Sequence, residues 1–287
     1  MGFLTQLIVW LNAAANALGR WILAPSAVLP GWLSATLVSI VSGVVFLLAF
    51  KYTSNQRAIK RVKDEIKAHL LALKLFKDSA EVALRAQEGI LLAAGRLMLF
   101  SLAPMVVMVV PVLLILGQLA LWYQARPLRV NEEAVVTLTL NPAMSDMASS
   151  VELEPNSAFA TTVGPVHIRS KHELCWNIQA RQGGYHRLQF HVGPETVEKE
   201  VAIGDGFMRV SKERPAWRWL DVLVNPWEKP FAADSPVQSI AIDYPSRVSW
   251  TRGLDSWTSG TDSWVIYWFV VSMVAGFCLR RPFKVIF

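Results

Sequence analysis

The sequence predicts an integral membrane protein built from α-helices, with a β-sandwich domain inserted between its last two membrane spans. Three observations support this fold class. The 287-residue chain is 53% hydrophobic and 17% charged, with a mean hydropathy of +0.34, a composition typical of membrane proteins. Long uncharged runs occur at 32–50, 97–125 and 263–279. Between the second and third runs, short β-rich stretches alternate with Gly, Pro and Asn turns.

The distribution of charge predicts which side of the membrane each part occupies. Residues 51–96 carry ten Lys and Arg against five Asp and Glu, and 280–287 carry three basic residues and no acid. Residues 126–262 carry fourteen basic and seventeen acidic residues, a net of −3. Basic segments stay cytoplasmic, so we expect 51–96 and the C-terminal tail inside and 126–262 outside, in a membrane of the bacterial cytoplasmic (inner) type. Attraction to anionic lipid headgroups is enough to explain why these segments are basic. No direct nucleic-acid recognition is predicted.

Residues 1–31 are predicted to form an interfacial amphipathic helix. Leucines and isoleucines share one helical face, whereas Asn12, Asn16 and Arg20 follow at steps of four on the other. A helix lying flat, with its two tryptophans at the headgroup level, avoids desolvating these polar groups. A first membrane span and a cleaved signal peptide are the alternatives, although no basic residue precedes the apolar core as it does in a signal peptide.

The three uncharged runs are predicted membrane spans. Those at 32–50 and 263–279 contain nineteen and seventeen residues, close to the roughly 20 that cross a hydrocarbon core. The run at 97–125 has 29 residues, so its helix either tilts or extends the preceding cytoplasmic segment into the bilayer. Pro104 and Pro111 are seven residues apart, on nearly the same helical face, and are expected to bend it.

Small and polar residues within the spans are candidates for helix contacts. Small residues at steps of four let a neighbouring helix approach closely, with the ordinary background composition of a span as the alternative. The candidate packing positions are Ala35, Ser39, Gly43, Ser272 and Gly276. Gln118 is a strongly polar side chain well inside the second span. It is predicted either to line a polar groove or to hydrogen-bond to a neighbouring helix.

Residues 51–96 are predicted to form a basic helical hairpin. Apolar residues recur at steps of three and four over 59–76, and the opposite face is Lys and Arg. The pattern restarts at Asp78, because Asp78 or Ser79 can cap a new helix and Glu81 follows as in a capping box. The two helices can then bury their apolar stripes on each other. One continuous helix, or two loosely solvated helices, is the alternative.

Residues 126–210 are predicted to form an extracytoplasmic β-sandwich. Seven short β-rich runs are separated there by turn sequences. The pair Cys175 and Trp176 is similar to the central strand of an immunoglobulin-like domain, but no second cysteine occurs on a later strand, so the likeness concerns architecture alone.

Residues 211–262 are predicted to be a membrane-proximal segment. The segment contains five tryptophans. We expect a short helix at 217–224 on the outer membrane interface and one further strand at 239–244. The tryptophans would form an aromatic belt at the membrane surface. An exposed patch that binds a partner is the alternative.

No catalytic, metal or cofactor site is predicted. His186 and His191 are five apart on a predicted strand and so point to opposite faces. The motifs of nucleophile elbows, phosphate-binding loops, zinc helices and redox Cys-x-x-Cys pairs do not occur. The two cysteines, Cys175 and Cys278, do not make a disulfide framework. We therefore expect a protein that is not an enzyme.

The predicted order is an interfacial helix, a span, a basic hairpin, a Pro-bent span and a further span. This order resembles the YidC-type membrane insertase superfamily, in particular its three-span members such as the archaeal YidC-like proteins and the insertase subunit of the endoplasmic reticulum membrane complex. The likeness covers 1–125 and 263–287, and depends on layout and on the hairpin at 55–78. Two features differ: 32–50 lacks the arginine that bacterial members carry in the corresponding span, and a β domain is inserted.

The resemblance implies a protein that assists the insertion or assembly of membrane proteins, through a hydrophilic groove open to the cytoplasm. Its partners would be the lipid bilayer, nascent chains and other membrane proteins. The residues implied in client or ribosome contact are Arg57, Lys60, Arg61, Lys63 and Lys67, and those of the groove are Ser101 and Gln118. The alternative, from another class, is a non-catalytic anchored scaffold that presents the β domain to a larger membrane complex.

Overall fold

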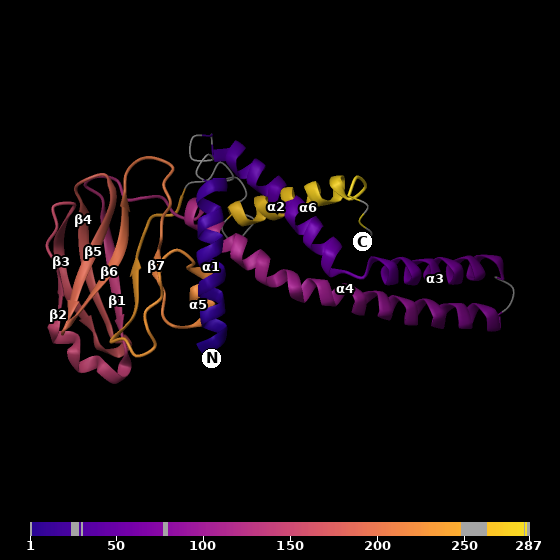
Figure 1. The fold of residues 1–287 in the computed structure, drawn as a ribbon, viewed down its shortest axis with the longest axis horizontal. Coiled ribbons are helices and arrows are strands. Elements are labelled where there is room, and N and C mark those ends of the chain that lie inside the picture. Colours follow the sequence, from indigo (N-terminus) through magenta and orange to yellow (C-terminus); the bar gives the residue numbers. More distant parts are fainter. Residues whose placement is uncertain are drawn as a thin grey trace. The chain divides into compact units, whose positions relative to one another are not determined.

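The chain folds into two compact units. The computed structural model describes residues 2–23, 29, 31–76, 80–247, 263–283 and 285. One unit, called here the β unit, comprises residues 1–34 and 113–265, and the other, called the helical unit, comprises 35–112 and 266–287. Figure 1 shows the elements of both, coloured along the sequence.

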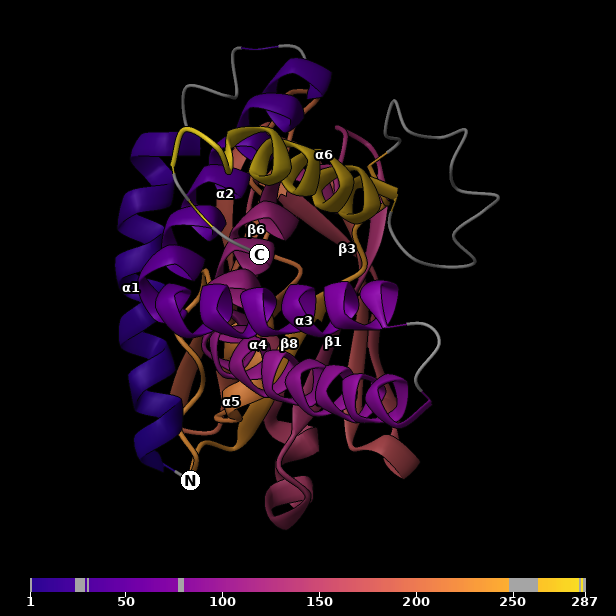
Figure 2. The same ribbon diagram turned by 90° about the vertical axis from the view of Figure 1, so that its right-hand side faces the viewer.

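Four helices contribute to the helical unit as far as its residues are described. They are α2 (Gly31–Thr53), α3 (Gln56–Leu75), the first part of α4 (Ala80–Tyr123) and most of α6 (Ser263–Leu279). The side chain of Asn55 caps α3 by accepting a hydrogen bond from the Ala58 amide at 3.1 Å. α3 and α4 lie side by side and antiparallel (Figures 1 and 2). The predicted cap at Asp78 or Ser79 lies outside the described residues.

The second helix of the hairpin and the second apolar run form one helix. α4 continues for 44 residues, with Pro104 and Pro111 inside it. At 1.5 Å per residue it is about 66 Å long, roughly twice the thickness of a hydrocarbon core. The excess length of the run at 97–125 is therefore explained by continuity with the hairpin.

Among the residues that the structure describes, two helices are long and apolar enough to cross a membrane, at Gly31–Thr53 and Glu81–Tyr123. The 17-residue α6 is shorter. Their large apolar side chains are mostly exposed, as at Met98 and Val106 of α4 and Phe269 of α6. Water-soluble monomers rarely expose contiguous apolar patches of more than a few hundred Å². These surfaces therefore need a covering other than water.

In the described part of the β unit, eight strands form two antiparallel sheets. The five-stranded sheet has the order β3-β4-β1-β8-β7 and the three-stranded sheet the order β2-β5-β6. The strands are β1 (Glu133–Leu140), β2 (Val151–Leu153), β3 (Phe159–Ile168), β4 (Glu173–Ala180), β5 (Gly184–Val192), β6 (Glu195–Ile203), β7 (Glu213–Arg214) and β8 (Val237–Ile242). Short 3-10 helices occupy Pro142–Ser150 and Arg169–Lys171.

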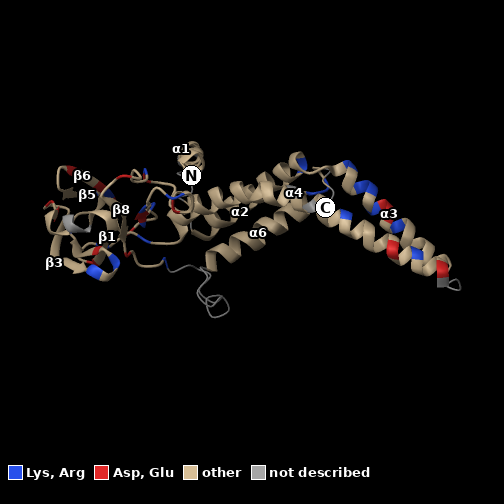
Figure 3. Cartoon of the chain, turned by 90° about the horizontal axis from the view of Figure 1, so that it is seen from below, with Lys and Arg blue, Asp and Glu red and all other residues tan. Residues whose placement is uncertain are grey.

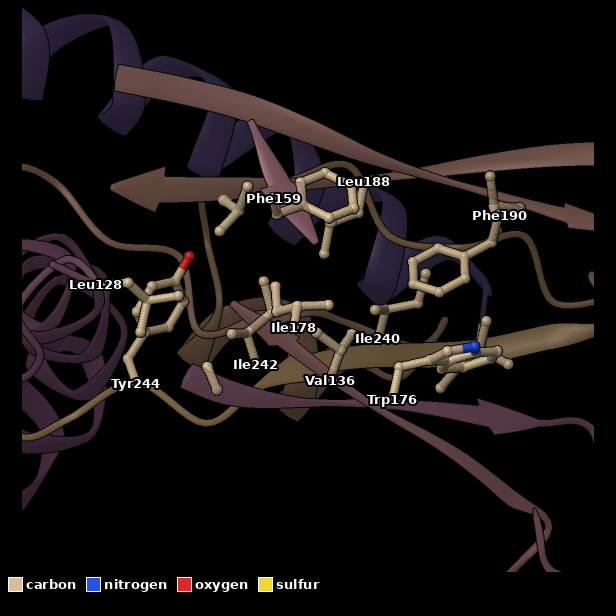
Figure 4. Close-up of a cluster of buried hydrophobic side chains, with 14 of the residues drawn as sticks. Leu128, Val136, Phe159, Trp176, Ile178, Leu188, Phe190, Ile240, Ile242 and Tyr244 are labelled. Carbon is tan, nitrogen blue, oxygen red and sulfur yellow. The ribbon is translucent and has the colours of Figure 1, made fainter. Parts of the chain in front are cut away.

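A hydrophobic core unites the two sheets. β1 and β4 bury every second residue, as the two-residue period of a strand requires. Trp176 of the five-stranded sheet packs against Phe190 of the three-stranded sheet, with ring centres 5.1 Å apart. Figure 4 shows these side chains together with Val136, Ile178 and Leu188.

The sheets extend beyond Val210, where the predicted sandwich ended. Val136 of β1 lies opposite Ile242 of β8, and β8 also pairs with β7. In a constant-type immunoglobulin domain, strands one, two, five and four share a sheet, and the order found here is different. Trp176 is nevertheless buried on β4, which lies between β3 and β1.

Two further helices pack together in the β unit, α1 (Gly2–Leu23) and α5 (Trp219–Val224). Ile8 of α1 is buried with Val222 and Leu223 of α5. Leu113 and Leu114, near the end of α4, pack against the same cluster.

Candidate functional site

The five basic residues implied in client or ribosome contact all lie on α3. Arg57, Lys60, Arg61 and Lys67 are exposed, and Lys63 is half-buried. The Lys67 ammonium lies 3.3 Å from the Asp64 carboxylate, in an exposed pair of a kind that contributes about 0–1 kcal/mol. Figure 3 shows several Lys and Arg positions along α3, whereas α2 and α6 are mostly without charged residues. The surface of α3 is therefore cationic.

The half of the hairpin nearest the apolar runs is closely packed. Ile59 and Val62 of α3 are buried. A Cβ atom on Gly89 of α4 would lie only 2.5 Å from the His69 ring, so the glycine permits the contact between the helices. The Arg96 guanidinium lies 3.4 Å from Glu65. This half of the predicted apolar stripe is therefore buried on the partner helix, as expected.

The other half of the hairpin exposes its apolar residues. Leu70 of α3, Phe76 directly after α3 and Leu84 of α4 are exposed. The expectation that the whole stripe is buried between the two helices is wrong for this half. The hairpin thus presents apolar side chains next to Lys67 and Lys74, a combination that suits an amphipathic segment of another chain.

Gln118 contacts α1. Its Nε2 donates a hydrogen bond to Oδ1 of Asn16 at 2.6 Å, and Nδ2 of Asn16 donates to the Pro226 carbonyl at 2.8 Å. Nδ2 of Asn12 donates to the Val222 carbonyl at 2.6 Å. Of the two predicted roles for Gln118, the hydrogen bond to a neighbouring helix is the one found.

The structure does not bring the two predicted groove residues together. Gln118 and Ser101 are seventeen residues apart on α4, or about 25 Å along its axis. The side chain of Ser101 lies outside the described residues.

The asparagines of α1 were expected to face water, but they face the α5 segment. The opposite side of α1 exposes Phe3, Leu7 and Trp10, and α5 exposes Leu220 and Val224. We call this surface the α1–α5 platform. An amphipathic platform of this kind is suited to a membrane interface, where Trp is favoured.

The small residues of α2 and α6 meet at one point. A Cβ atom on Gly43 would lie 2.4 Å from the Ser272 carbonyl oxygen. Thr36 Oγ1 and the Tyr267 hydroxyl share a hydrogen bond of 2.7 Å. Gly276 lies one turn further, with its Cβ position 3.9 Å from the Gly43 carbonyl oxygen. The remaining packing candidates lie on the same stretch of α2, where the Ser39 hydroxyl donates to the Ala35 carbonyl at 2.6 Å.

An apolar cavity of about 290 Å³ lies between α2, α4 and α6. Phe46, Met108 and Trp268 contribute to its lining, which is almost entirely apolar. The resemblance implies a hydrophilic groove, and this cavity does not have that character. Trp268 Nε1 is buried, with no acceptor among the residues that the structure describes.

A buried ion pair in the β unit was missed at the level of sequence. Lys199 of β6 is 0% exposed, and its ammonium donates to Glu228 Oε1 at 2.5 Å and to the Ser211 carbonyl at 2.8 Å. Glu228 also accepts from the Ser211 hydroxyl at 2.6 Å. Burial lowers the pKa of Lys199, whereas the charge of Glu228 opposes that shift. One signal in the sequence could have revealed it. Val197, Lys199 and Val201 are two residues apart along β6, so all three point to the same, inward face of the strand.

No metal centre is formed by the described residues, since no group of three or more His, Cys, Asp or Glu is positioned to hold an ion. His186 Nε2 contacts the Gln182 carbonyl at 3.0 Å, and His191 contacts Thr196 at 3.1 Å. Cys175 and Cys278 are both free.

Comparisons of the chain with protein-family models, with curated proteins and with solved structures gave no match.

Proposed function

We propose that this protein is a YidC-like insertase or chaperone that assists the insertion or assembly of other membrane proteins. The observation that supports this function is the make-up of the helical unit. There, exposed apolar helices are continuous with a hairpin that is cationic on α3 and apolar at its far half. The mechanism would be physical and would need no covalent step or cofactor.

In the proposed topology, α2, the apolar part of α4 and α6 cross a bacterial cytoplasmic membrane. The hairpin and the C-terminal tail are cytoplasmic, because basic loops stay on that side, and the β unit is extracytoplasmic with the α1–α5 platform on the outer leaflet. The 17-residue α6 is about 25 Å long, less than the roughly 30 Å hydrocarbon core. A short span is accommodated by local thinning of the bilayer.

Thinning and electrostatic attraction together would lower the barrier to insertion. A charged residue at the bilayer centre costs about 2.5–3.5 kcal/mol on insertion scales, so a thinner path reduces the cost for the polar flank of a client. The basic face of α3 would collect an acidic segment of a nascent chain or of ribosomal RNA. The exposed leucines of the hairpin would hold the apolar segment of the client until it enters the bilayer.

The proposal is tested by insertion of small single-span clients into vesicles that contain the purified protein. Neutralising the basic face of α3 should lower the yield several-fold. The variant replaces Arg57, Lys60, Arg61, Lys63 and Lys67 with Gln. A matched control replaces five basic residues of the β unit with Gln, at Arg129, Arg169, Lys171, Arg181 and Arg218. Equal yields for both variants and the wild type would contradict the proposed client contact, and unchanged insertion in depleted cells would contradict the function itself.

A membrane-anchored scaffold is the second candidate, favoured by the structure of the β unit. This unit holds both sheets, and within it Asn12 and Asn16 join α1 to α5 and to the segment that follows α5. The two functions are separated by replacing 130–245 with a short Gly-Ser linker, because the five-stranded sheet extends to Ile242. Insertion of clients by the remaining helical unit supports the insertase, whereas loss of function together with loss of a stoichiometric complex supports the scaffold.

A further inference from the structure

β6 is an edge strand of the three-stranded sheet, and its outer backbone groups are mostly bonded to side chains. The order β2-β5-β6 leaves one side of β6 without a partner strand. On that side the Glu198 carbonyl accepts a hydrogen bond from Arg214 Nη1 at 2.6 Å, and the Glu200 amide donates to Glu228 Oε2 at 3.1 Å. Because outward-facing residues alternate along an antiparallel edge, the N–H and C=O of Thr196 face the same side.

The outer backbone of Thr196 is open in the part of the chain that the structure describes. Its hydroxyl contacts His191 Nδ1 at 3.1 Å, but no described residue outside the β5–β6 ladder bonds to its N–H or C=O. Unpaired backbone groups on a sheet edge are the template to which an extended peptide adds as a further strand.

A cavity of about 660 Å³ adjoins this end of β6 within the β unit. Its volume is in the range of ligand-binding pockets. The Arg214 guanidinium is held at its wall, because Nε donates to the Lys229 carbonyl at 3.0 Å and Cζ lies 4.1 Å from the centre of the Phe231 ring. Its lining includes both apolar and charged residues, among them Val9, Glu195, Val197, Arg214, Trp217 and Phe231.

Arg214 retains hydrogen-bonding capacity for an anion. Its Nη2 donates to none of the described residues. Burial lowers the pKa of Arg214, and the charges of Glu228 and Glu198 oppose that shift. Both carboxylates are already paired, with Lys199 at 2.5 Å and Arg187 at 2.8 Å. A partly buried guanidinium that lacks a counter-ion of its own favours a carboxylate ligand.

The rim of the cavity limits the charge of this ligand. Glu195 and Asp234 are exposed there, and neither forms an ion pair with a described residue. Their negative charges oppose a second negative charge on the ligand. A single carboxylate therefore fits better than a dianionic phosphate, and a basic group elsewhere on the ligand is favoured.

We propose that this cavity binds the C-terminal end of an extended peptide segment of a partner protein. The terminal carboxylate accepts hydrogen bonds from Arg214, the peptide backbone pairs with Thr196, and an apolar last side chain packs against Trp217 and Phe231. Thr196 and Glu198 are about 7 Å apart along the strand, which one or two peptide residues span. The site lies in the β unit and does not depend on insertase activity.

The test is retention of peptides by the purified full-length protein, immobilised in mild detergent. The probes are two pools of labelled hexapeptides that contain one lysine and end in Val, Leu or Phe. One pool has free C-terminal carboxylates and the other has carboxamides. The free acids should be retained with about tenfold higher affinity than the matching amides, the usual order for a charge-assisted contact. Equal retention of both pools, or retention of neither, would refute the proposal.

Benzoate is the probe for the alternative occupant, a small organic anion. Melting temperatures are measured with benzoate and with the retained peptides. The peptides should raise the melting temperature of the protein. A rise with benzoate and none with any peptide would overturn the peptide assignment.

Variants assign the binding to the named groups, with peptide affinity measured by fluorescence anisotropy. Arg214→Gln should weaken binding of the free acid about tenfold and leave the weaker binding of the amide unchanged. Thr196→Pro removes the outward N–H, in an edge strand where proline is tolerated, and should weaken binding several-fold. Thr196→Val keeps that N–H and is the matched control, which should bind as the wild type does.

A second control and a folding check complete the series. Arg129→Gln, at an exposed arginine of the same unit, should leave the affinity unchanged. If the melting temperature shows that Arg214→Gln does not fold, Thr196→Pro and its valine control carry the test. Wild-type affinity in both Arg214→Gln and Thr196→Pro would overturn the site, and insertion activity is measured separately on the same preparations.

Discussion

At the scale of single residues, the Lys199–Glu228 pair makes the β unit sensitive to a change of one charge. Lys199→Met leaves Glu228 buried without its cation, which costs about 3–5 kcal/mol when a buried pair is broken. We therefore expect a melting temperature lower by several degrees in differential scanning calorimetry of the purified protein. Lys171→Met, at an exposed lysine, should melt as the wild type does.

A second variant separates the charge effect from the loss of packing. Lys199→Met combined with Glu228→Gln removes both charges and keeps an acceptor for the Ser211 hydroxyl, so it should regain part of the lost stability. A double variant no more stable than Lys199→Met alone would argue against an electrostatic cause.

The ion pair of Glu132 with Arg126 predicts that the free energy of unfolding decreases at acid pH. Its hydrogen bonds with the Arg126 guanidinium, at 2.6 and 2.7 Å, lower its pKa from 4.5 to about 2, against the opposing effect of burial. A carboxylate with a lowered pKa in the folded state stabilises the fold above its unfolded pKa, and the contribution is lost as pH falls from about 5 to 2. The shift corresponds to on the order of 3 kcal/mol.

The measurement is the free energy of unfolding of the purified protein in denaturant between pH 7 and pH 2. Glu132→Gln should be less stable than the wild type at pH 7, and the difference should disappear toward pH 2. Glu152→Gln, at an exposed glutamate, serves as control. A constant difference across this range would show that the ionised form of Glu132 is not what stabilises the fold.

At the scale of elements, the crossing of α2 and α6 depends on the lack of a side chain at Gly43. Gly43→Ala places a methyl group against the Ser272 carbonyl oxygen, and we expect overpacking to cost about 1–3 kcal/mol. Gly95→Ala is the matched control in a helix, because a Cβ atom there meets nothing within 4 Å. It should be neutral or stabilising by roughly 0.5–1 kcal/mol, since alanine is the better helix former. Melting temperatures in mild detergent compare the two, and equal values would contradict the close crossing.

Most helices and strands were predictable from the sequence, because the spacing of apolar residues that marks each of them is visible within a few neighbouring residues. The helical repeat in 59–76 and the alternation in β1 and β4 depend on neighbours within a few residues. The partner of α1 was not predictable, since Asn12 binds Val222, 210 residues away. The same holds for Lys199, whose acceptor Glu228 comes from a segment with no strand pattern of its own.

Element boundaries were harder to predict where two patterns merge. The basic repeat of the hairpin gives way to the apolar run near residue 97, and nothing in the backbone stops there, so α4 continues through both. The helical spacing of apolar residues also did not predict which of these side chains are exposed. Leu70 and Leu84 fit the predicted stripe but are exposed, because burial depends on whether a partner surface reaches that far.

At the scale of the whole molecule, the proposed topology predicts opposite labelling of its two ends. In a chain with Cys175→Ser and Cys278→Ser, a cysteine at Arg181 of the β unit should react with an impermeant maleimide on intact spheroplasts. A cysteine at Lys74 of α3 should react only after permeabilisation. Both positions are exposed in the structure, so accessibility within the fold does not limit either reaction. Labelling of both from the same side would contradict the three-span arrangement.

The two prolines of α4 have a mechanical consequence for such a molecule. Each proline lacks a backbone N–H, so the carbonyls of Phe100 and Val107 lack their usual hydrogen-bond donors within the helix. α4 therefore bends most easily along this stretch. Pro111 lies next to the residue at which α4 passes from one unit to the other. Bending at that point would let the basic hairpin move while the packing of the two sheets stayed unchanged.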